Sequence, residues 1–92
     1  MKAKFKVTDE FKLRKDESFT RSFPLGGYSP DGSVRDIDKA NKRAGSVATA
    51  YEIHDSTEID MGEVWYLLDF GDLNVNLNEQ KLLELFEPLE RH

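Results

Sequence analysis

The feature that most constrains the fold is a pair of matched segments near the C-terminal end. Residues 64 to 70 read VWYLLDF, residues 73 to 77 read LNVNL, and a Gly-Asp pair separates them. An apolar segment and an alternating segment joined by two turn residues are typical of a β-hairpin. In the two-residue-loop register Leu68 faces Val75, and a slip of one residue would turn the apolar residues of the second strand to the polar face. The pattern therefore predicts an antiparallel hairpin in one register.

A further strand is expected upstream, at residues 47 to 54. Here Val47, Thr49, Tyr51 and Ile53 alternate with Ala48, Ala50, Glu52 and His54. This period of two is the strand period, and the segment is expected to pair antiparallel with residues 63 to 70.

An amphipathic helix is predicted directly after the hairpin. Asn78 is a suitable N-cap, Leu77 and Leu82 occupy the positions of a hydrophobic staple, and Glu79 places negative charge at the positive end of the helix dipole. The apolar face comprises Leu82, Leu85, Phe86 and, past the end, Leu89. Pro88 is expected to end the helix, because proline disfavours a helical conformation in the residue before it.

A weaker central helix is expected from about Val34 to Ala44. Ser33 begins a capping-box-like sequence and Gly45 is a plausible stop. Only four small or apolar residues, namely Val34, Ile37, Ala40 and Ala44, could face a core.

The N-terminal third has two predicted features. Phe5 and Val7 alternate with basic residues before residues 8 to 10, as Phe11 and Leu13 do after them, which suggests a second hairpin; alternatively, the threonine at position 8 caps a short helix. Residues 22 to 33 are a Gly/Pro/Ser-rich segment and are expected to form a flexible loop. Taken together, residues 1 to 92 predict one small α+β domain, with an antiparallel sheet of three to five strands, a C-terminal helix and the weaker central helix.

The size and composition favour a soluble, cytoplasmic protein. A chain of 92 residues buries a small core, and it has no cysteine that could form a disulfide. The longest apolar run is residues 64 to 68, far short of the roughly 20 residues that cross a bilayer. No membrane association is expected.

Charge is unevenly distributed along the chain. Residues 1 to 46 hold eleven Lys or Arg against seven Asp or Glu, whereas residues 47 to 92 hold two against eleven. Like charges on one small surface repel, so the acidic half requires something basic opposite it, which is either the chain's own first half or another molecule.

No motif for catalysis, a cofactor or a metal is present. The glycine pair at 26 and 27 fits no phosphate-binding pattern, and the acids around residues 55 to 63 do not have the spacing of a calcium loop. His54 lies beside Glu52 and Asp55 but has no nucleophile in a recognisable setting. We therefore expect a non-enzymatic protein without a cofactor.

The acidic half suggests a protein-binding module or a stoichiometric inhibitor. A broad negative surface steers toward basic partners and can compete with nucleic acid for a basic groove, so a nucleic-acid-handling protein is a reasonable partner. The expected contact residues lie on the loop at 55 to 63 and on the C-terminal helix, at Asp55, Glu58, Asp60, Glu63, Glu84 and Glu87. The alternative is that the acids serve solubility and internal pairing. Compositions of this kind are common among accessory proteins of phages and mobile elements, an association that carries no mechanism.

A second hypothesis uses the basic half to bind nucleic acid. On the predicted central helix a basic stripe is formed by Arg35, Lys39, Lys42 and Arg43. Such a stripe could contact phosphates, although a net charge of −5 opposes tight binding. Nucleic acid is therefore the less expected partner, and the oligomeric state is left open.

Overall fold

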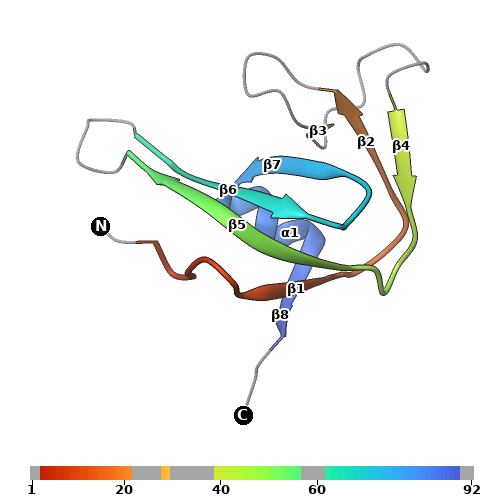
Figure 1. Cartoon of the computed structure of the whole chain (residues 1–92), viewed down its shortest axis with the longest axis horizontal. Coiled ribbons are helices and arrows are strands. Elements are labelled where there is room, and N and C mark those ends of the chain that lie inside the picture. The colour runs from red at the N-terminus through yellow and green to blue at the C-terminus, as the bar shows by residue number, and fades with distance from the viewer. Residues whose placement is uncertain (1–2, 22–27, 30–38, 57–61, 90–92) are drawn as a thin grey trace.

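The computed structural model describes residues 3 to 21, 28 to 29, 39 to 56 and 62 to 89. In chain order these residues form β1 (Glu10–Leu13), β2 (Glu17–Arg21), β3 (Tyr28–Ser29), β4 (Lys39–Lys42), β5 (Val47–Asp55), β6 (Val64–Asp69), β7 (Asn74–Asn78), α1 (Glu79–Leu85) and β8 (Phe86–Leu89) (Figure 1). This part of the chain is mostly sheet with one short helix. The prediction of an α+β domain with three to five strands and a central helix is therefore wrong.

The strands lie in the order β4-β2-β3-β7-β6-β5-β1-β8. Five of them, β7-β6-β5-β1-β8, form an antiparallel sheet, β2 and β4 form a two-stranded arm, and β3 joins the two by pairing with both β2 and β7. The arm keeps the register of the β1–β5 ladder. Glu10 lies opposite Thr49, and seven residues further along the chain Glu17 lies opposite Lys42, which is seven residues before Thr49. The sheet curls around its core, so one long bent hairpin serves both the five-stranded sheet and the arm (Figure 1).

The C-terminal hairpin has the predicted register. Tyr66 pairs with Leu77 and Leu68 with Val75, and all four residues are buried. Gly71, in the turn, has a φ of 101°, a left-handed conformation that glycine adopts without steric strain. The prediction of this hairpin is confirmed.

The strand predicted at 47 to 54 is β5, and it pairs antiparallel with β6 as expected. Its small residues face the core, because Ala48 and Ala50 are buried, whereas Val47 and Tyr51 are each 42% exposed. A register shift between Ala50 and Glu52 marks a β-bulge at Tyr51. Beyond the bulge the faces exchange, so Ile53 packs against the core.

The C-terminal helix begins as predicted and ends earlier. Asn78 is the N-cap, and its Oδ1 accepts a hydrogen bond from the Lys81 backbone N–H at 2.8 Å. The helix ends at Leu85 and the next four residues form β8, an outer strand that pairs with β1. Pro88 therefore lies within a strand at the sheet edge, where its missing N–H removes no donor that the ladder needs.

The predicted central helix is wrong where it can be compared with the structure. Residues 34 to 38 lie outside the described residues, and residues 39 to 42 form β4. An apolar stripe of four small or apolar residues gave the helix little to bury, while the strand conformation pairs Ala40 with the buried Phe19. Tertiary pairing overrides the local helix signals.

The N-terminal hairpin is also wrong, because only residues 10 to 13 of the described residues 3 to 13 form a strand. Residues 6 to 9 make a tight turn in which Thr8 has a φ of 83° and Asp9 Oδ2 accepts from the Lys6 N–H. Thr8 does not cap a helix. In the predicted loop at 22 to 33, residues 28 to 29 form β3 and the others lie outside the described residues.

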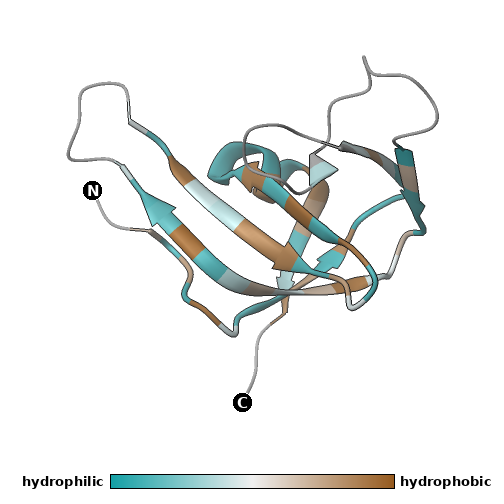
Figure 2. Cartoon of the chain, turned by 45° about the horizontal axis from the view of Figure 1, so that its top comes forward, coloured by the Kyte–Doolittle hydropathy of each residue, from teal (hydrophilic) through white to brown (hydrophobic). Residues whose placement is uncertain are grey.

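The core fills the inside of the curled sheet and holds most of the aromatic residues. Ring centroids of Phe19, Phe70 and Phe86 lie 5.9 to 6.4 Å apart, and Phe5 meets Phe11 edge to face at 5.0 Å. Hydrophobic and hydrophilic segments alternate along the strands (Figure 2). This alternation gives the sheet an inner apolar face and an outer face that is available for function.

Candidate binding surface

Two of the predicted acidic residues lie together at one end of the β5–β6 hairpin. Asp55 ends β5 and its Oδ2 accepts a hydrogen bond from the Ala3 N–H at 3.0 Å. Glu63 precedes β6, and its Oε1 lies 3.4 Å from Asn78 Nδ2. Both carboxylates therefore have partners within the chain. Glu58 and Asp60 lie outside the described residues.

The other two predicted acids lie on different elements. Glu84 is on α1, where it pairs with Lys81 at 3.2 Å. Glu87 is on β8 and pairs with Lys12 of β1 at 3.3 Å. The four described acidic positions thus divide among a hairpin end, a helix and a strand, and they do not share one element.

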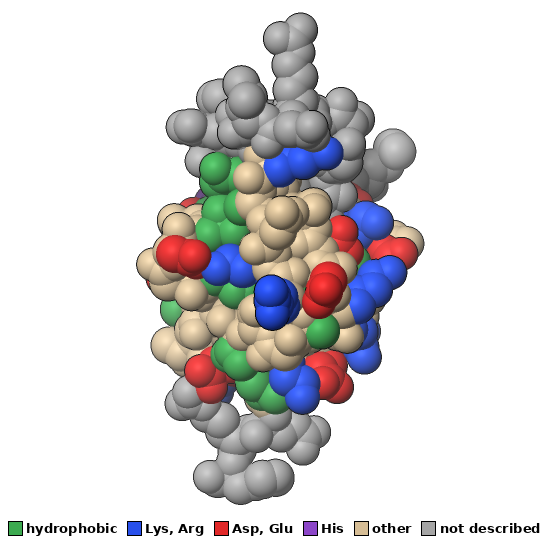
Figure 3. Space-filling model, turned by 90° about the vertical axis from the view of Figure 1, so that its right-hand side faces the viewer, with side chains coloured by type: hydrophobic (Ala, Val, Ile, Leu, Met, Phe, Trp, Pro, Cys, Tyr) green, Lys and Arg blue, Asp and Glu red, His purple; other side chains and the backbone are tan. Residues whose placement is uncertain are grey.

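The two charge halves of the sequence are interleaved in space. Lys12 of the first half pairs with Glu87 of the second, and Lys42 pairs with Asp72 at 2.5 Å. Basic and acidic side chains are interspersed on the face seen in Figure 3. The expectation that the basic half lies opposite part of the acidic half is met by these pairs.

The predicted basic stripe is divided by the strand conformation. Arg35 lies outside the described residues, and Lys39 and Lys42 lie at the two ends of β4, with Arg43 directly after it. The Lys42 side chain is only 18% exposed, because its ammonium group binds Asp72 and lies 5.1 Å from the ring centroid of Phe70. These residues do not form the helical stripe that the sequence suggested.

Strand pairing collects a different acidic set on the outer side of the five-stranded sheet. Directly paired residues lie on the same side of a sheet, and one row runs across all five strands in the order Asn74, Asp69, Thr49, Glu10, Leu89. A second row contains Val47, Lys12 and Glu87. We call the outer face the surface formed by Glu10, Lys12, Val47, Thr49, Tyr51, Glu52, Asp69, Glu87 and Leu89. It carries four carboxylates and one ammonium group.

Tyr51 is the large exposed aromatic residue of the outer face. The β-bulge leaves this residue without a partner in the β5–β6 register, and its side chain is 42% exposed. Partial burial raises the pKa of the Tyr51 hydroxyl, and the carboxylates of Glu52 and Asp69 raise it further. Tyr51 is therefore a neutral donor beside acids, with Val47, also 42% exposed, on the same strand.

The β7 part of the outer side is polar and partly buried. Asn74, Asn76 and Asn78 alternate with the core residues of β7, and Asn76 pairs in register with Leu67. Asn76 is 1% exposed, and no hydrogen-bond partner of its Oδ1 or its Nδ2 is found among the described residues. A buried amide with no partner is unfavourable for stability.

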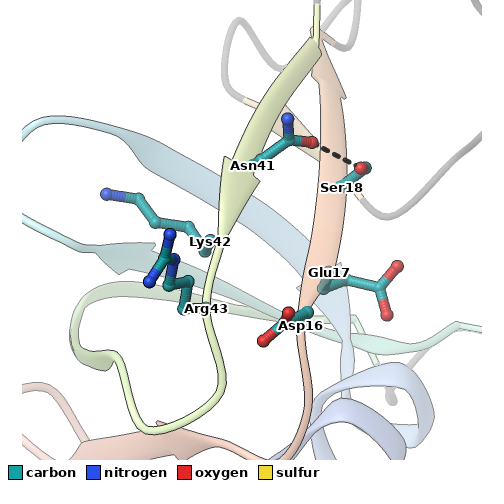
Figure 4. A pocket seen from close by; sticks show the side chains of 6 residues that line it. All are labelled: Asp16, Glu17, Ser18, Asn41, Lys42 and Arg43. Atoms are coloured by element: carbon teal, nitrogen blue, oxygen red, sulfur yellow. Dashed lines mark hydrogen bonds between the residues drawn. The ribbon is translucent and has the colours of Figure 1, made fainter.

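A polar hollow of about 450 Å³ lies on the arm, at the bend between β2 and β4. It is lined by Asp16, Glu17, Ser18, Asn41, Lys42 and Arg43 (Figure 4). Ser18 Oγ lies 2.6 Å from Asn41 Oδ1, and Asp16 Oδ1 accepts from the Ala44 N–H. Figure 4 shows Lys42 and Arg43 extending from β4 away from β2.

His54, the histidine that the structure describes, lies on an exposed part of β5. His54 Nε2 lies 2.7 Å from Glu52 Oε2, and both side chains are exposed on a strand. Within residues 3 to 21, 28 to 29, 39 to 56 and 62 to 89, no group of three or more His, Cys, Asp or Glu side chains is placed to hold a metal. In the same residues no helix has the length and apolar character needed to span a bilayer.

Comparison with known proteins gave no match to a family model, a curated protein or a solved structure. Tyr51 and Val47 were not among the residues predicted from sequence to form a contact surface. The available signal was the alternation of residues 47 to 54, because it places Val47 and Tyr51 on the other side of the strand from Ala48 and Ala50.

Proposed function

We propose that this chain is a non-catalytic protein-binding module whose outer face engages a basic surface of a protein partner. The observation that carries the proposal is the position of Tyr51. It is an exposed aromatic residue beside Glu52 and Asp69, on a sheet face with four carboxylates. Tyrosine is enriched among the residues that dominate binding energy at protein interfaces.

Charge supports a basic partner. The chain has a net charge of −5, and the carboxylates of the outer face flank apolar surface on Val47 and Tyr51. Such a face would attract a basic partner over long range, while Tyr51 would supply contact area at short range. A nucleic-acid-handling protein, which presents a basic groove, fits this description, and occupation of that groove would make the module a stoichiometric inhibitor.

The proposed contact residues differ from those suggested by the sequence. Glu87 remains, because β8 places it on the outer face. Asp55 pairs with the buried Val64 and so lies on the inner side of the sheet. Glu63 precedes β6 and Glu84 lies on α1, so none of the three belongs to the outer face. We therefore assign the main contact to Tyr51, Val47 and their acidic neighbours.

The test begins with a photo-crosslinking residue at position 51 and, as a control, at position 84 on α1. The protein captured through position 51 in source cells is identified, purified and mixed with the chain. Its association rate is then measured against salt for the double variant Glu52→Lys with Glu87→Lys, and for the double variant Glu63→Lys with Glu84→Lys as the charge-matched control. We expect the outer-face pair to slow association and to flatten its salt dependence, and Tyr51→Ala to speed dissociation.

Two results would contradict the proposal. One is an association rate that is the same for the wild type and the Glu52 and Glu87 variants. The other is a contact that maps to the arm or to residues 22 to 33 and is unaffected by Tyr51→Ala. In either case the acidity of the chain would serve solubility only.

A further inference from the structure

The β-bulge in β5 places two consecutive residues on the same side of the sheet. Ala50 pairs with Leu68 and Glu52 pairs with Leu67, so Tyr51 and Glu52 together oppose the single residue Leu67. Consecutive strand residues ordinarily point to opposite sides, whereas a bulge re-aims a side chain. Leu68 belongs to the core, so its neighbour Leu67 and the two residues opposite Leu67 face outward. Tyr51 and Glu52 are both exposed and lie side by side on the outer face.

A second carboxylate flanks Tyr51 from the neighbouring strand. Asp69 ends β6 and pairs with Thr49, which lies two residues before Tyr51 on β5. Partial burial raises the pKa of the Tyr51 hydroxyl, and the charges of Glu52 and Asp69 raise it further, so both carboxylates are close enough to act on the hydroxyl. The ring is therefore neutral at physiological pH and lies between two negative charges.

Both carboxylates can accept further hydrogen bonds. Asp69 Oδ1 accepts from the Gly71 N–H at 2.7 Å, and Glu52 Oε2 lies 2.7 Å from His54 Nε2. Each contact uses one oxygen, whereas a carboxylate offers about four lone-pair sites on its two oxygens. Among the described residues, no lysine or arginine forms an ion pair with either carboxylate. The charge beside Tyr51 is thus left for a cation from outside this part of the chain.

An aromatic ring between two carboxylates favours arginine over lysine. The guanidinium group is planar and weakly hydrated, so it stacks on an aromatic face while its N–H groups donate to carboxylates at its edge. The ammonium group of lysine is compact and strongly hydrated, so it gains charge attraction but loses more water on stacking. A phosphate or carboxylate of a partner would be repelled by both acids.

We propose that Tyr51, Glu52 and Asp69 bind an arginine side chain of the partner protein, with the guanidinium group stacked on the Tyr51 ring and its N–H groups donating to the two carboxylates. This inference rests on the function proposed above and names the residue that the basic partner presents to the outer face. The carboxylates supply attraction to any cation, and the ring supplies the preference for arginine.

The probe is a blocked heptapeptide of alternating glycine and arginine, titrated into the full chain with ¹³C-labelled tyrosine rings. We expect the ring signals of Tyr51 to shift, and the δ-methylene protons of the peptide's arginines to move upfield because they lie over the ring. The matched peptide has lysine in place of arginine and the same charge. It should bind about threefold more weakly, since a cation–π contact at an exposed site is modest.

Variants of the three residues test the geometry. Tyr51→Phe keeps the ring and should keep the preference for arginine, whereas Tyr51→Ala should make the two peptides bind alike. If Tyr51→Ala fails to fold, Tyr51→Leu provides the same test with an apolar side chain that has no ring. Glu52→Gln and Asp69→Asn should each weaken binding of the arginine peptide, and the asparagine retains an oxygen that can accept from Gly71. Glu84→Gln, which removes one charge from α1, is the matched control and should leave binding unchanged.

Three results would overturn this inference. The first is no shift of the Tyr51 ring with millimolar arginine peptide. The second is equal affinity of the wild type for the two peptides, which would mean charge attraction alone and would leave the proposal of a basic partner standing. The third is a preference for arginine that survives Tyr51→Ala, which would place the arginine elsewhere.

Failure of the proposed function would look different. In that case the peptide preference would still depend on Tyr51, but the protein captured through position 51 would associate equally fast with the wild type and with the Glu52 and Glu87 double variant. The arginine site would then stand, and the role of the outer face in attracting that partner would not.

Discussion

Lys42 of β4 and Asp72 of the β6–β7 turn are joined by an ion pair that ties the arm to the five-stranded sheet. Lys42 Nζ lies 2.5 Å from Asp72 Oδ1, and the two residues are 30 positions apart in the chain. The hydrogen bond from Lys42 lowers the pKa of Asp72 below its ordinary value of 3.8. A carboxylate whose pKa is lowered by folding stabilises the folded state above its unfolded pKa, and this contribution is lost as pH falls through the folded pKa.

The first prediction follows from the lowering of the Asp72 pKa in the folded state. Asp72→Asn should lower the melting temperature at neutral pH. The difference from the wild type should begin to shrink as the pH falls below about 4, the unfolded pKa, and should disappear only below the lowered pKa of Asp72 in the folded state. The measurement is thermal unfolding across pH. Glu84→Gln, which breaks the exposed pair with Lys81, is the control and should have a smaller effect at neutral pH. A difference that is constant down to acid pH would mean that Asp72 acts through packing instead of charge.

The second prediction concerns the paired core residues of the β6–β7 hairpin. Leu68→Ala and Val75→Ala should each lower the free energy of unfolding by about 1 to 4 kcal/mol, because both side chains are buried and their loss leaves a cavity. Val47→Ala, the same substitution at a residue that is 42% exposed, should change it by less than about 0.5 kcal/mol. Chemical denaturation measures all three. Equal changes in the free energy of unfolding at Val75 and Val47 would show that the hairpin is not part of the core.

The third prediction concerns the buried amide of Asn76. Within the part of the chain that the structure describes, neither polar atom of its side chain has a hydrogen-bond partner, so no contact there offsets the desolvation cost of the amide. Asn76→Leu, of similar volume, should leave the free energy of unfolding unchanged or raise it by up to about 1 kcal/mol. Asn78→Leu is the contrasting variant, because it removes the helix cap and should lower stability by about 1 kcal/mol. A loss of stability in Asn76→Leu as large as that in Asn78→Leu would show that the Asn76 amide forms hydrogen bonds in the folded state.

The fourth prediction concerns the closed edge of β8. Pro88 lies opposite Phe11, between positions whose backbone groups pair with β1, so an N–H introduced at position 88 would point to solvent. Pro88→Thr should leave the fold intact and cause concentration-dependent self-association, which sedimentation velocity would detect. Glu87→Thr introduces the same residue where the backbone is already paired and should stay monomeric if the wild type does. The Phe86 carbonyl at this edge accepts a hydrogen bond from Arg14 Nε at 2.9 Å. A monomeric Pro88→Thr variant would show that this hydrogen bond closes the edge without Pro88.

The outer face shows how far the sequence could lead toward a candidate site. Charge counting singled out Glu87 as a candidate contact residue, which stays a prediction, and it joined this residue to Glu84 through a helix that ends before position 87. Tyr51 and Val47 became visible only once pairing showed that the alanines of β5 face the core. The surface is formed by residues from four strands that are distant in the chain, and one-dimensional spacing does not bring them together.

Local patterns in the sequence determined the β6–β7 hairpin and the beginning of α1. Leu68 meets Val75 across a two-residue turn, and Asn78 caps the amide of a residue three positions ahead. In both cases the interacting residues are close in the sequence, so turn residues, alternation and the capping residue are enough to predict the contact.

Tertiary structure decided the identity of β4 and β8. Residues 39 to 42 carry weak helix signals, yet they pair with residues of β2 that lie 19 to 25 positions earlier. Residues 86 to 89 leave the helix to pair with β1 at the other end of the chain. For short segments the free energy of a turn or two of helix is small, and the gain from pairing Ala40 with Phe19 and from burying Phe86 decides the conformation. That gain depends on strands that are distant in the sequence, and for this reason only the folded structure shows it.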